Sequence, residues 1–218
     1  MYNLKKGLNI PISGSPEGTV SDSTKISHVG ILGPDYIGMK PTMMVEVGDQ
    51  VKIGSVLFED KKNPGVFFTS PAGGLIKSIN RGEKRRFISI EIEVADQENQ
   101  VEILNDSDEI LLRNLSKYGV INNFRTRPFN KTPKPNDIPN DIFVNICDTN
   151  PLSVDPYIYL QHEIDLFNRS LMKLKEIFNC NIHVCYQNND FNNFIDGINY
   201  YNFKGCLLYT SDAADEFM

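Results

Sequence analysis

The sequence has 218 residues, of which 40% are hydrophobic and 23% are charged, and its formal net charge is -6. This length gives room for one or two modest hydrophobic cores. The acidic balance argues against nucleic acid as the main partner, because phosphate binding depends on clustered Lys and Arg. No run approaches about 18 apolar residues and no signal peptide is visible, so we expect no transmembrane segment.

The first part of the chain, residues 1–103, has the pattern of a small all-β unit. Short apolar runs are separated by Gly and Pro, which is typical of strands joined by tight turns. These runs are Val29 to Leu32, Met43 to Val47, Val51 to Phe58, Val66 to Phe68 and Phe87 to Val94. In the last run Ile88, Ile90, Ile92 and Val94 alternate with polar residues, which predicts a strand with one wet face. Asn63-Pro64-Gly65 predicts a hairpin tip.

The second part changes to longer periodicity after a polar, Pro-rich stretch. We expect a connecting segment over residues 104–140, with a linker from Arg125 to Asp141, and a partial α/β domain over residues 141–205. Asp141 to Cys147 and Cys180 to Gln187 predict buried strands. Between them Asp155-Pro156 marks a helix start, and one apolar stripe predicts a single helix of about five to six turns. The stripe consists of Leu160, Ile164, Phe167, Leu171, Leu174 and Phe178.

The sequence shows no catalytic, cofactor-binding or metal-ligating constellation. The cysteines at 147, 180, 185 and 206 form no C-x-x-C pair, so we expect free thiols. His28, His162 and His183 are isolated, which favours solvated or packed rings. Asp148 follows a strand, where α/β ligands often bind, but capping a turn with Asn150 is its commoner role.

The last residues, 206–218, do not read as the end of a domain. The stretch CLLYTSDAADE resembles a translated sequencing adapter, so residues 206–218 are set aside as an expected artefact. The natural chain is then expected to continue beyond Gly205.

Two levels of resemblance follow from the motifs. VEVGDQVKIGSVL and SPAGGLIKSI resemble the barrel-sandwich hybrid of biotinyl and lipoyl carrier domains. DKKNPGVFFTSPAGG followed by RTRPFNKTPKP and DTNPLSVDP resembles the A subunits of the bacterial Na+-translocating NADH:quinone oxidoreductases. We therefore expect an α+β multidomain protein, with an N-terminal β barrel-sandwich hybrid followed by a truncated Rossmann-like α/β domain.

The family resemblance implies one component of a translocase that oxidises NADH, reduces ubiquinone and exports Na+. It implies no cofactor bound by this chain, although the complex uses NADH, flavins, an iron-sulfur centre, ubiquinone and Na+. The implied partners are the other subunits, mainly the membrane-embedded quinone-side subunit, with ubiquinone as a further ligand and no nucleic acid. The implied place is the cytoplasmic face of the bacterial inner membrane, as a peripheral protein that contributes assembly and quinone access.

Two other functions fit parts of the pattern. The C subunit of an Rnf-type electron transport complex shares this fold order but predicts a ferredoxin-like run of cysteines. A biotinyl or lipoyl carrier predicts a covalent adduct on Lys61 or Lys62. Pro64-Gly65 follows these lysines too closely for a carrier hairpin, and flanking Met residues are missing. We expect an unmodified docking hairpin at Lys61, Lys62, Asn63, Pro64 and Gly65.

Two loops carry side chains suited to a quinone or a partner protein. The first offers Tyr36, Ile37 and Met39, and inward packing of these apolar residues is an equally good explanation. The second offers Arg125, Arg127 and Phe129, whose guanidinium groups suit a carbonyl-bearing head group or acidic surface residues. We expect these loops to face each other or a membrane partner.

Overall fold

The computed structural model describes residues 2–3, 12–20, 25–95, 100–101, 114–148, 150, 152–187 and 191–204. The expected artefact at residues 206–218 lies outside them. The chain divides into two compact units, Thr24–Asp137 and Met1–Ser23 with Ile138–Met218. Each unit is described by itself, as the β unit and the α/β unit. None of the helices that the structure describes has the length and apolar content to cross a membrane.

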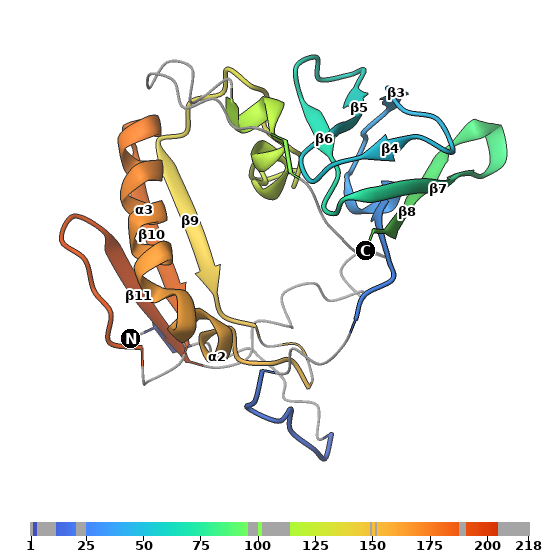
Figure 1. Ribbon diagram of the computed structural model, residues 1–218. Helices are drawn as coiled ribbons and strands as arrows, with labels where there is room; N and C mark the ends of the chain where they lie inside the picture. The colour runs from blue at the N-terminus through green and yellow to red at the C-terminus, as the bar shows by residue number, and fades with distance from the viewer. Residues whose placement is uncertain are drawn as a thin grey trace, which may run out of the picture. The chain divides into compact units, whose positions relative to one another are not determined.

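The β unit contains two antiparallel sheets (Figure 1). One sheet has the order β2 (His28–Leu32), β8 (Phe87–Val94), β7 (Gly74–Arg81) and β4 (Gln50–Val51). The other has the order β3 (Pro41–Met43), β5 (Val56–Asp60) and β6 (Phe67–Thr69). The pairing of β5 with β6 confirms the predicted hairpin around Asn63-Pro64-Gly65.

Aromatic and branched side chains from both sheets form the core of the β unit. Phe58 stacks on Phe68 with ring centroids 4.6 Å apart and lies 5.2 Å from Phe87. Leu57, Ile76, Ile90 and Ile92 are fully buried around them. Burial of such side chains stabilises a fold by about 1.5–3 kcal/mol each, so this cluster dominates the stability of the unit.

Strand β8 differs from the predicted alternation at Ile88. Ile90 and Ile92 face the core, but Ile88 is exposed and Phe87 is buried in its place. The register with β7 shifts between Asn80 and Arg81, so a bulge reverses the side-chain direction at this end.

The predicted Met43 to Val47 strand is also shorter than expected. Strand β3 ends at Met43. The Asp49 carboxylate accepts a hydrogen bond from the Glu46 backbone N–H at 2.8 Å, which closes a turn in place of further strand.

The described part of the β unit contains three short 3₁₀ helices, two between its strands and one after its last strand. They are η1 (Gly33–Asp35), η2 (Glu83–Arg85) and η3 (Val120–Asn123). Ile121 on η3 is buried in the core. The segment before the second unit is therefore anchored to the β unit by an apolar side chain.

The α/β unit is a parallel sheet with helical segments. The strand order is β1 (Tyr2–Asn3), β11 (Asn199–Lys204), β10 (Asn181–Tyr186) and β9 (Asp141–Ile146). The helical segments α2 (Tyr157–Leu160), η4 (Gln161–Glu163) and α3 (Ile164–Phe178) connect β9 to β10 (Figure 1). Ile182, Val184 and Leu171 are buried between helix and sheet.

The predicted single helix is wrong in its continuity. The 3₁₀ turn η4 separates α2 from α3, and Glu163 has a non-helical backbone with φ -124° and ψ 26°. The helix begins at Tyr157, one residue after the predicted start at Pro156, and the Asp155 carboxylate accepts the backbone N–H of Tyr157 at 2.9 Å. Apolar periodicity predicts which face is buried, but it does not detect a local change of helix type.

Candidate functional site

The first predicted loop turns its Tyr and Met toward the protein and leaves its Ile outside. The Tyr36 backbone N–H donates to the Gly33 carbonyl at 3.2 Å, which fixes the ring after η1. The ring meets Phe68 edge to face at 4.6 Å. Met39 packs against the core, whereas Ile37 is 56% exposed. Only Ile37 of the three offers a free apolar surface.

Arg125 joins the second predicted loop to the first. Its guanidinium carbon lies 5.1 Å from the centroid of the Tyr36 ring, within range of a cation-π interaction. The same group donates to the carbonyl oxygens of Asn122 and Phe124. The two loops therefore meet at Tyr36 and Arg125, as one of the two expected arrangements requires. Arg127 and Phe129 are exposed and do not share this contact.

A cavity of about 370 Å³ lies beside this contact. Strand β2, the Tyr36 loop, the end of β6 and the η3 segment line it. Its lining includes Ile31, Asp35, Tyr36, Phe68, Tyr118 and Asn122. Small-molecule sites are usually lined mainly by apolar and aromatic side chains, whereas the exposed lining of this cavity is mainly polar.

Asn122 supplies an unusual polar atom in this lining. The residue is 6% exposed, and its amide nitrogen donates to the Phe67 carbonyl at 2.7 Å. This bond fixes the orientation of the amide, since a carbonyl accepts only from the nitrogen. The amide oxygen is buried and has no hydrogen-bond partner among the described residues. A buried acceptor without a donor is unfavourable.

Gly119 brings the η3 segment close to β6. Its φ is +73°, and a Cβ at this position would lie 2.6 Å from Thr69 Oγ1. The Thr69 hydroxyl donates to the Tyr118 carbonyl at 3.2 Å across the same approach. The wall of the cavity therefore depends on a glycine. Tyr118, Gly119 and Asn122 were not predicted from the sequence, in which the conformational freedom of Gly119 is the available signal.

The predicted docking hairpin has a fixed backbone and free lysine side chains. Asp60 is buried, and its carboxylate accepts the backbone N–H groups of Lys40 and Lys62, both at 3.0 Å. Asn63 donates its amide to the Pro133 carbonyl at 3.1 Å. Lys61 and Lys62 are exposed. The tip is thus a rigid platform that presents cations.

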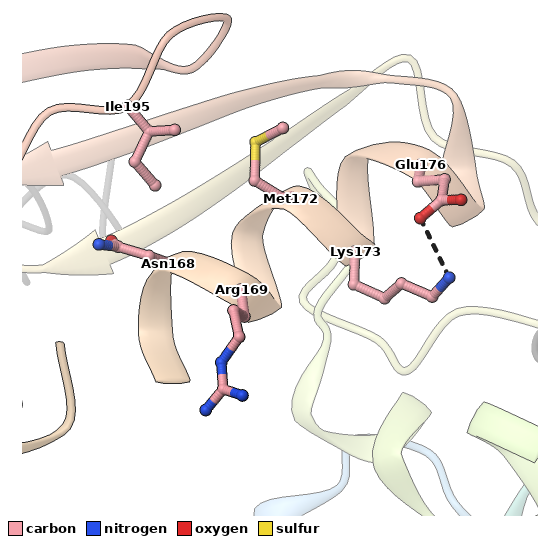
Figure 2. Close-up of a pocket in the computed structure, with 6 residues that line it drawn as sticks. All are labelled: Asn168, Arg169, Met172, Lys173, Glu176 and Ile195. Carbon is pink, nitrogen blue, oxygen red and sulfur yellow. Dashed lines mark hydrogen bonds and ion pairs between the residues drawn. The ribbon is translucent and has the colours of Figure 1, made fainter. Parts of the chain in front are cut away.

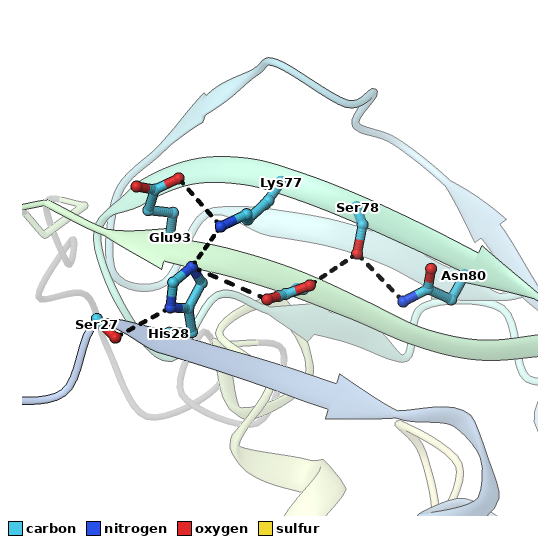
Figure 3. Close-up of polar contacts among 7 residues, drawn as sticks. Ser27, His28, Lys77, Ser78, Asn80 and Glu93 are labelled. Atoms are coloured by element: carbon cyan, nitrogen blue, oxygen red, sulfur yellow. Dashed lines mark hydrogen bonds and ion pairs between the residues drawn. The ribbon is translucent and has the colours of Figure 1, made fainter.

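A polar network covers the outer surface of the β2-β8-β7 sheet (Figure 3). Lys77 donates its ammonium to His28 Nε2 at 2.8 Å, so the other ring nitrogen, Nδ1, carries the proton that faces Ser27 Oγ at 3.0 Å. Lys77 also lies 3.8 Å from the Glu93 carboxylate. His28 is therefore a solvated histidine in a surface network, as expected.

His183 has partners that sequence spacing does not reveal. Its Nε2 lies 2.8 Å from the Asp141 carboxylate, and Nδ1 lies 3.2 Å from the Tyr201 hydroxyl. The hydrogen bond from His183 lowers the pKa of the Asp141 carboxyl below its ordinary value, with a smaller contribution from Asn181. The ring also stacks on Phe143 at 4.7 Å. His183 is a packed residue that ties β9, β10 and β11 together.

A shallow hollow of about 610 Å³ lies on the outer side of α3 (Figure 2). Met172 and Ile195 give it an apolar floor, and Asn168, Arg169, Lys173 and Glu176 surround it. Lys173 and Glu176 pair at 3.0 Å on its rim. Arg169 instead contacts the Asp165 backbone carbonyl at 3.4 Å.

The other candidate residues of the α/β unit have structural roles. The Asp148 carboxylate accepts the backbone and side-chain N–H groups of Asn150 at 2.9 and 2.7 Å, which confirms turn capping. Cys147, Cys180 and Cys185 are free thiols. Burial raises the pKa of Cys147 to about 11, so its reactive thiolate is scarce at neutral pH.

Two family models match consecutive parts of the chain. Residues 2–95 match the NqrA N-terminal barrel-sandwich hybrid domain, and residues 106–207 match the NqrA second alpha/beta domain. These matches confirm the predicted fold class. The domain boundaries drawn at residues 103 and 140 stay predictions.

Curated relatives agree with these models. The chain is 46% identical over 193 residues to the A subunit of the Na(+)-translocating NADH-quinone reductase of Yersinia pseudotuberculosis, and 47% over 192 residues to that of Neisseria meningitidis. The corresponding protein of Pasteurella multocida is 44% identical over 192 residues. Each match covers 85% of this chain and 43% of the relative. The chain thus spans less than half the length of these relatives. The Rnf-type and carrier alternatives receive no support from them.

Proposed function

The chain belongs to the family of NqrA proteins, the A subunits of Na+-translocating NADH-quinone reductases, and we propose that it has that role in such a complex. The complex couples NADH oxidation and quinone reduction to Na+ export. In this proposal NADH, the flavins and the iron-sulfur centre are bound by other subunits. This chain contributes to assembly with the membrane-embedded quinone-side subunit, at the cytoplasmic face of the membrane, and to quinone access.

The cavity beside Tyr36 is the observation that carries the quinone part of the proposal. Its volume of about 370 Å³ suits one substituted ring, and Tyr36 offers aromatic surface to it. The amide oxygen of Asn122, which is buried and has no donor among the described residues, would accept the hydroxyl group of a reduced quinone if quinone binding uncovers it. Arg125 holds the Tyr36 ring in place from the second loop. These contacts favour a small, flat ligand with polar ends.

Ile37, Arg127 and Phe129 support the assembly part. All three are exposed, and Phe129 is 71% exposed. Aromatic and Arg side chains are enriched where proteins bind one another. We propose that these residues contact partners and that Tyr36 and Arg125 shape the cavity.

The test uses the complex purified from a native host that carries variants of this chain. Asn122→Leu fills the polar corner with an apolar side chain, and Arg125→Ala releases Tyr36. Both are expected to raise the KM for quinone about tenfold or more, with NADH oxidation by an artificial acceptor unchanged. Tyr159→Ala, which removes an exposed ring from α2, is the matched control.

Assembly of the complex is measured separately in the same preparations. Arg127→Ala is expected to reduce the amount of this chain that copurifies with the complex, at an unchanged KM. A normal KM for both cavity variants in a fully assembled complex would overturn the quinone-access part of the proposal and leave the assembly part standing. Full assembly and activity in a strain that lacks this chain would overturn the proposed role as a whole.

A further inference from the structure

Exposed lysines gather around the β5-β6 hairpin tip. Lys61 and Lys62 form the tip, and the Lys61 backbone N–H donates to the Lys40 carbonyl at 2.8 Å, which places Lys40 beside it. All three side chains are exposed. Because the buried Asp60 holds the backbone of Lys40 and Lys62, these cations are presented from a fixed position.

The Pro-rich segment adds further cations to the same place. Asn63 at the tip donates to the Pro133 carbonyl, and a Cβ on Gly65 would lie 3.2 Å from the Pro135 ring. These contacts hold Lys131 and Lys134, which flank Pro133 and are exposed, next to the hairpin. The segment therefore extends the basic surface and does not cover it.

A tight loop at the end of this segment presents an aromatic ring. Thr126 and Lys131 form an antiparallel bridge, with the Thr126 N–H donating to the Lys131 carbonyl at 2.7 Å. Phe129 lies between them and is 71% exposed. The Lys131 ammonium lies 5.7 Å from the centre of its ring, and Arg127 is exposed in the same loop.

The carboxylates around this surface turn toward the backbone. Glu59 accepts the Gly65 N–H at 2.8 Å, and Asp137 accepts the Lys134 N–H at 2.8 Å. With Asp60 they face six cations, in a chain whose formal net charge is -6. We call the exposed set the lysine surface: Lys40, Lys61, Lys62, Arg127, Phe129, Lys131 and Lys134.

We propose that the lysine surface binds an anionic lipid membrane directly. Lysines attract anionic head groups with a free energy that adds up charge by charge, and a protruding aromatic ring inserts at the head-group level. Protein interfaces are depleted in Lys, because a mobile ammonium loses entropy when one partner fixes it. Five lysines with one exposed Phe therefore fit a diffuse lipid surface better than an acidic protein.

The inference goes beyond the proposed role in the complex and does not depend on it: Arg127 and Phe129 are shared with the assembly proposal, whereas the five lysines belong to the lipid-binding surface alone. Lipid binding is a property of the isolated chain, whereas assembly and quinone access need other subunits. If the cavity variants leave the KM for quinone unchanged, the lipid-binding inference still stands. If the chain does not bind lipid, the proposed role in the complex still stands.

The test is sedimentation of the purified full chain with lipid vesicles. Vesicles contain either phosphatidylcholine alone or equal parts of phosphatidylcholine and phosphatidylglycerol. The chain is expected to bind only the anionic vesicles, and binding is expected to fall about tenfold or more between about 0.1 M and about 0.5 M NaCl. Binding to both kinds of vesicle with equal affinity would contradict an electrostatic surface.

Two variants and one matched control locate the binding. Lys61→Glu with Lys62→Glu is expected to weaken binding at least about tenfold, and Phe129→Ala about threefold. Lys84→Glu with Arg85→Glu changes the net charge equally at another exposed hairpin tip, η2, where no exposed aromatic ring follows. This control is expected to bind like the wild type.

Three outcomes would overturn the inference. One is equal weakening by the η2 control, which would indicate non-specific attraction. Another is no binding to anionic vesicles while the folded chain is captured by detergent-solubilised membrane proteins, which would indicate an acidic protein partner. The third is unchanged binding by both lysine-surface variants. Circular dichroism of each variant establishes that it is folded before binding is compared.

Discussion

Position 119 requires glycine both for its positive φ and for its close approach to Thr69, and comparison with Gly38 distinguishes these two reasons. Gly119 has φ +73° and lies against Thr69, whereas Gly38 has φ +77° and an added Cβ there would meet nothing within 4 Å. Gly119→Ala is expected to lower the free energy of unfolding by about 2 kcal/mol or more, and Gly38→Ala by about 1 kcal/mol. Urea unfolding followed by circular dichroism measures both. Equal losses would mean that the approach of η3 to Thr69 adapts easily.

Cys147 is expected to be unreactive in the folded chain. Burial raises the pKa of its thiol to about 11, so its alkylation by iodoacetamide should increase about tenfold per pH unit between pH 7 and pH 10. Half-exposed Cys185 should react faster at every pH, although burial raises its pKa as well. Peptide mass spectrometry with and without urea gives the comparison. Rapid labelling of Cys147 at pH 7 without urea would contradict the buried position.

Tyr36 and Arg125, which were proposed from the sequence, lie at or beside the cavity, but their arrangement was not predicted. Tyr36 and Arg125 were predicted because an aromatic ring and a guanidinium suit a flat ligand that carries carbonyl groups. Asn122 gave no signal, since its importance comes from an amide oxygen left without a donor by a bond to distant Phe67. Likewise His183 meets Asp141 only after two parallel strands pair. Contacts of this kind depend on tertiary structure, which spacing along the chain does not encode.

At the scale of elements, the β5-β6 hairpin depends on one buried carboxylate. Asp60→Ala removes the acceptor of two backbone N–H groups and is expected to lower the free energy of unfolding by about 2–4 kcal/mol. Asp60→Asn keeps an oxygen for both donors, so a loss of about 1 kcal/mol is expected. Urea unfolding of the two variants is the measurement. If both lose the same amount, the negative charge and not the hydrogen bonding holds the tip.

The Asp141-His183 contact makes the parallel sheet sensitive to acid. The hydrogen bond from His183 lowers the pKa of Asp141 from its ordinary value of 3.8. The stabilisation is therefore complete above about pH 3.8 and is lost as the pH falls toward the lowered pKa of the folded state. The Tm of Asp141→Asn should depend less on pH between 5 and about 3 than that of the wild type. Asp165→Asn on α3 is the control, and equal pH dependence in all three chains would refute the assignment.

Element positions were predicted well where one face of the element is buried. The tip at Asn63-Pro64-Gly65 and the bounds of β8 agree with the structure, because turn residues and alternation act locally. The bulge that exposes Ile88 and the turn η4 within the helix were missed. Both are adjustments of one element to its neighbour, so a pattern within a single element does not predict them.

At the scale of the whole molecule, the two units differ in how they use the ends of the chain. The β unit is continuous, and its core runs from Val51 to Ile121. The α/β unit combines the beginning and the end of the chain, because β1 pairs with β11 through Tyr2 and Phe203. In the described part of the chain, the strand pairing that makes this connection comes from the two residues of β1. Its partner lies about two hundred residues away, beyond the range in which local sequence patterns predict pairing.

This arrangement predicts that the β unit folds without the rest of the chain. A fragment of residues 24–137 contains every strand of both antiparallel sheets and all residues of their core, so a single cooperative urea transition is expected. A chain that lacks residues 1–23 should instead lose stability in the α/β unit, because the Tyr2 ring no longer stacks on Phe203 at 5.4 Å and β11 becomes an edge strand. Amide hydrogen exchange resolves the two units. Faster exchange in β5 to β8 of the truncated chain, or an unfolded fragment 24–137, would show that the β unit depends on the remainder of the protein.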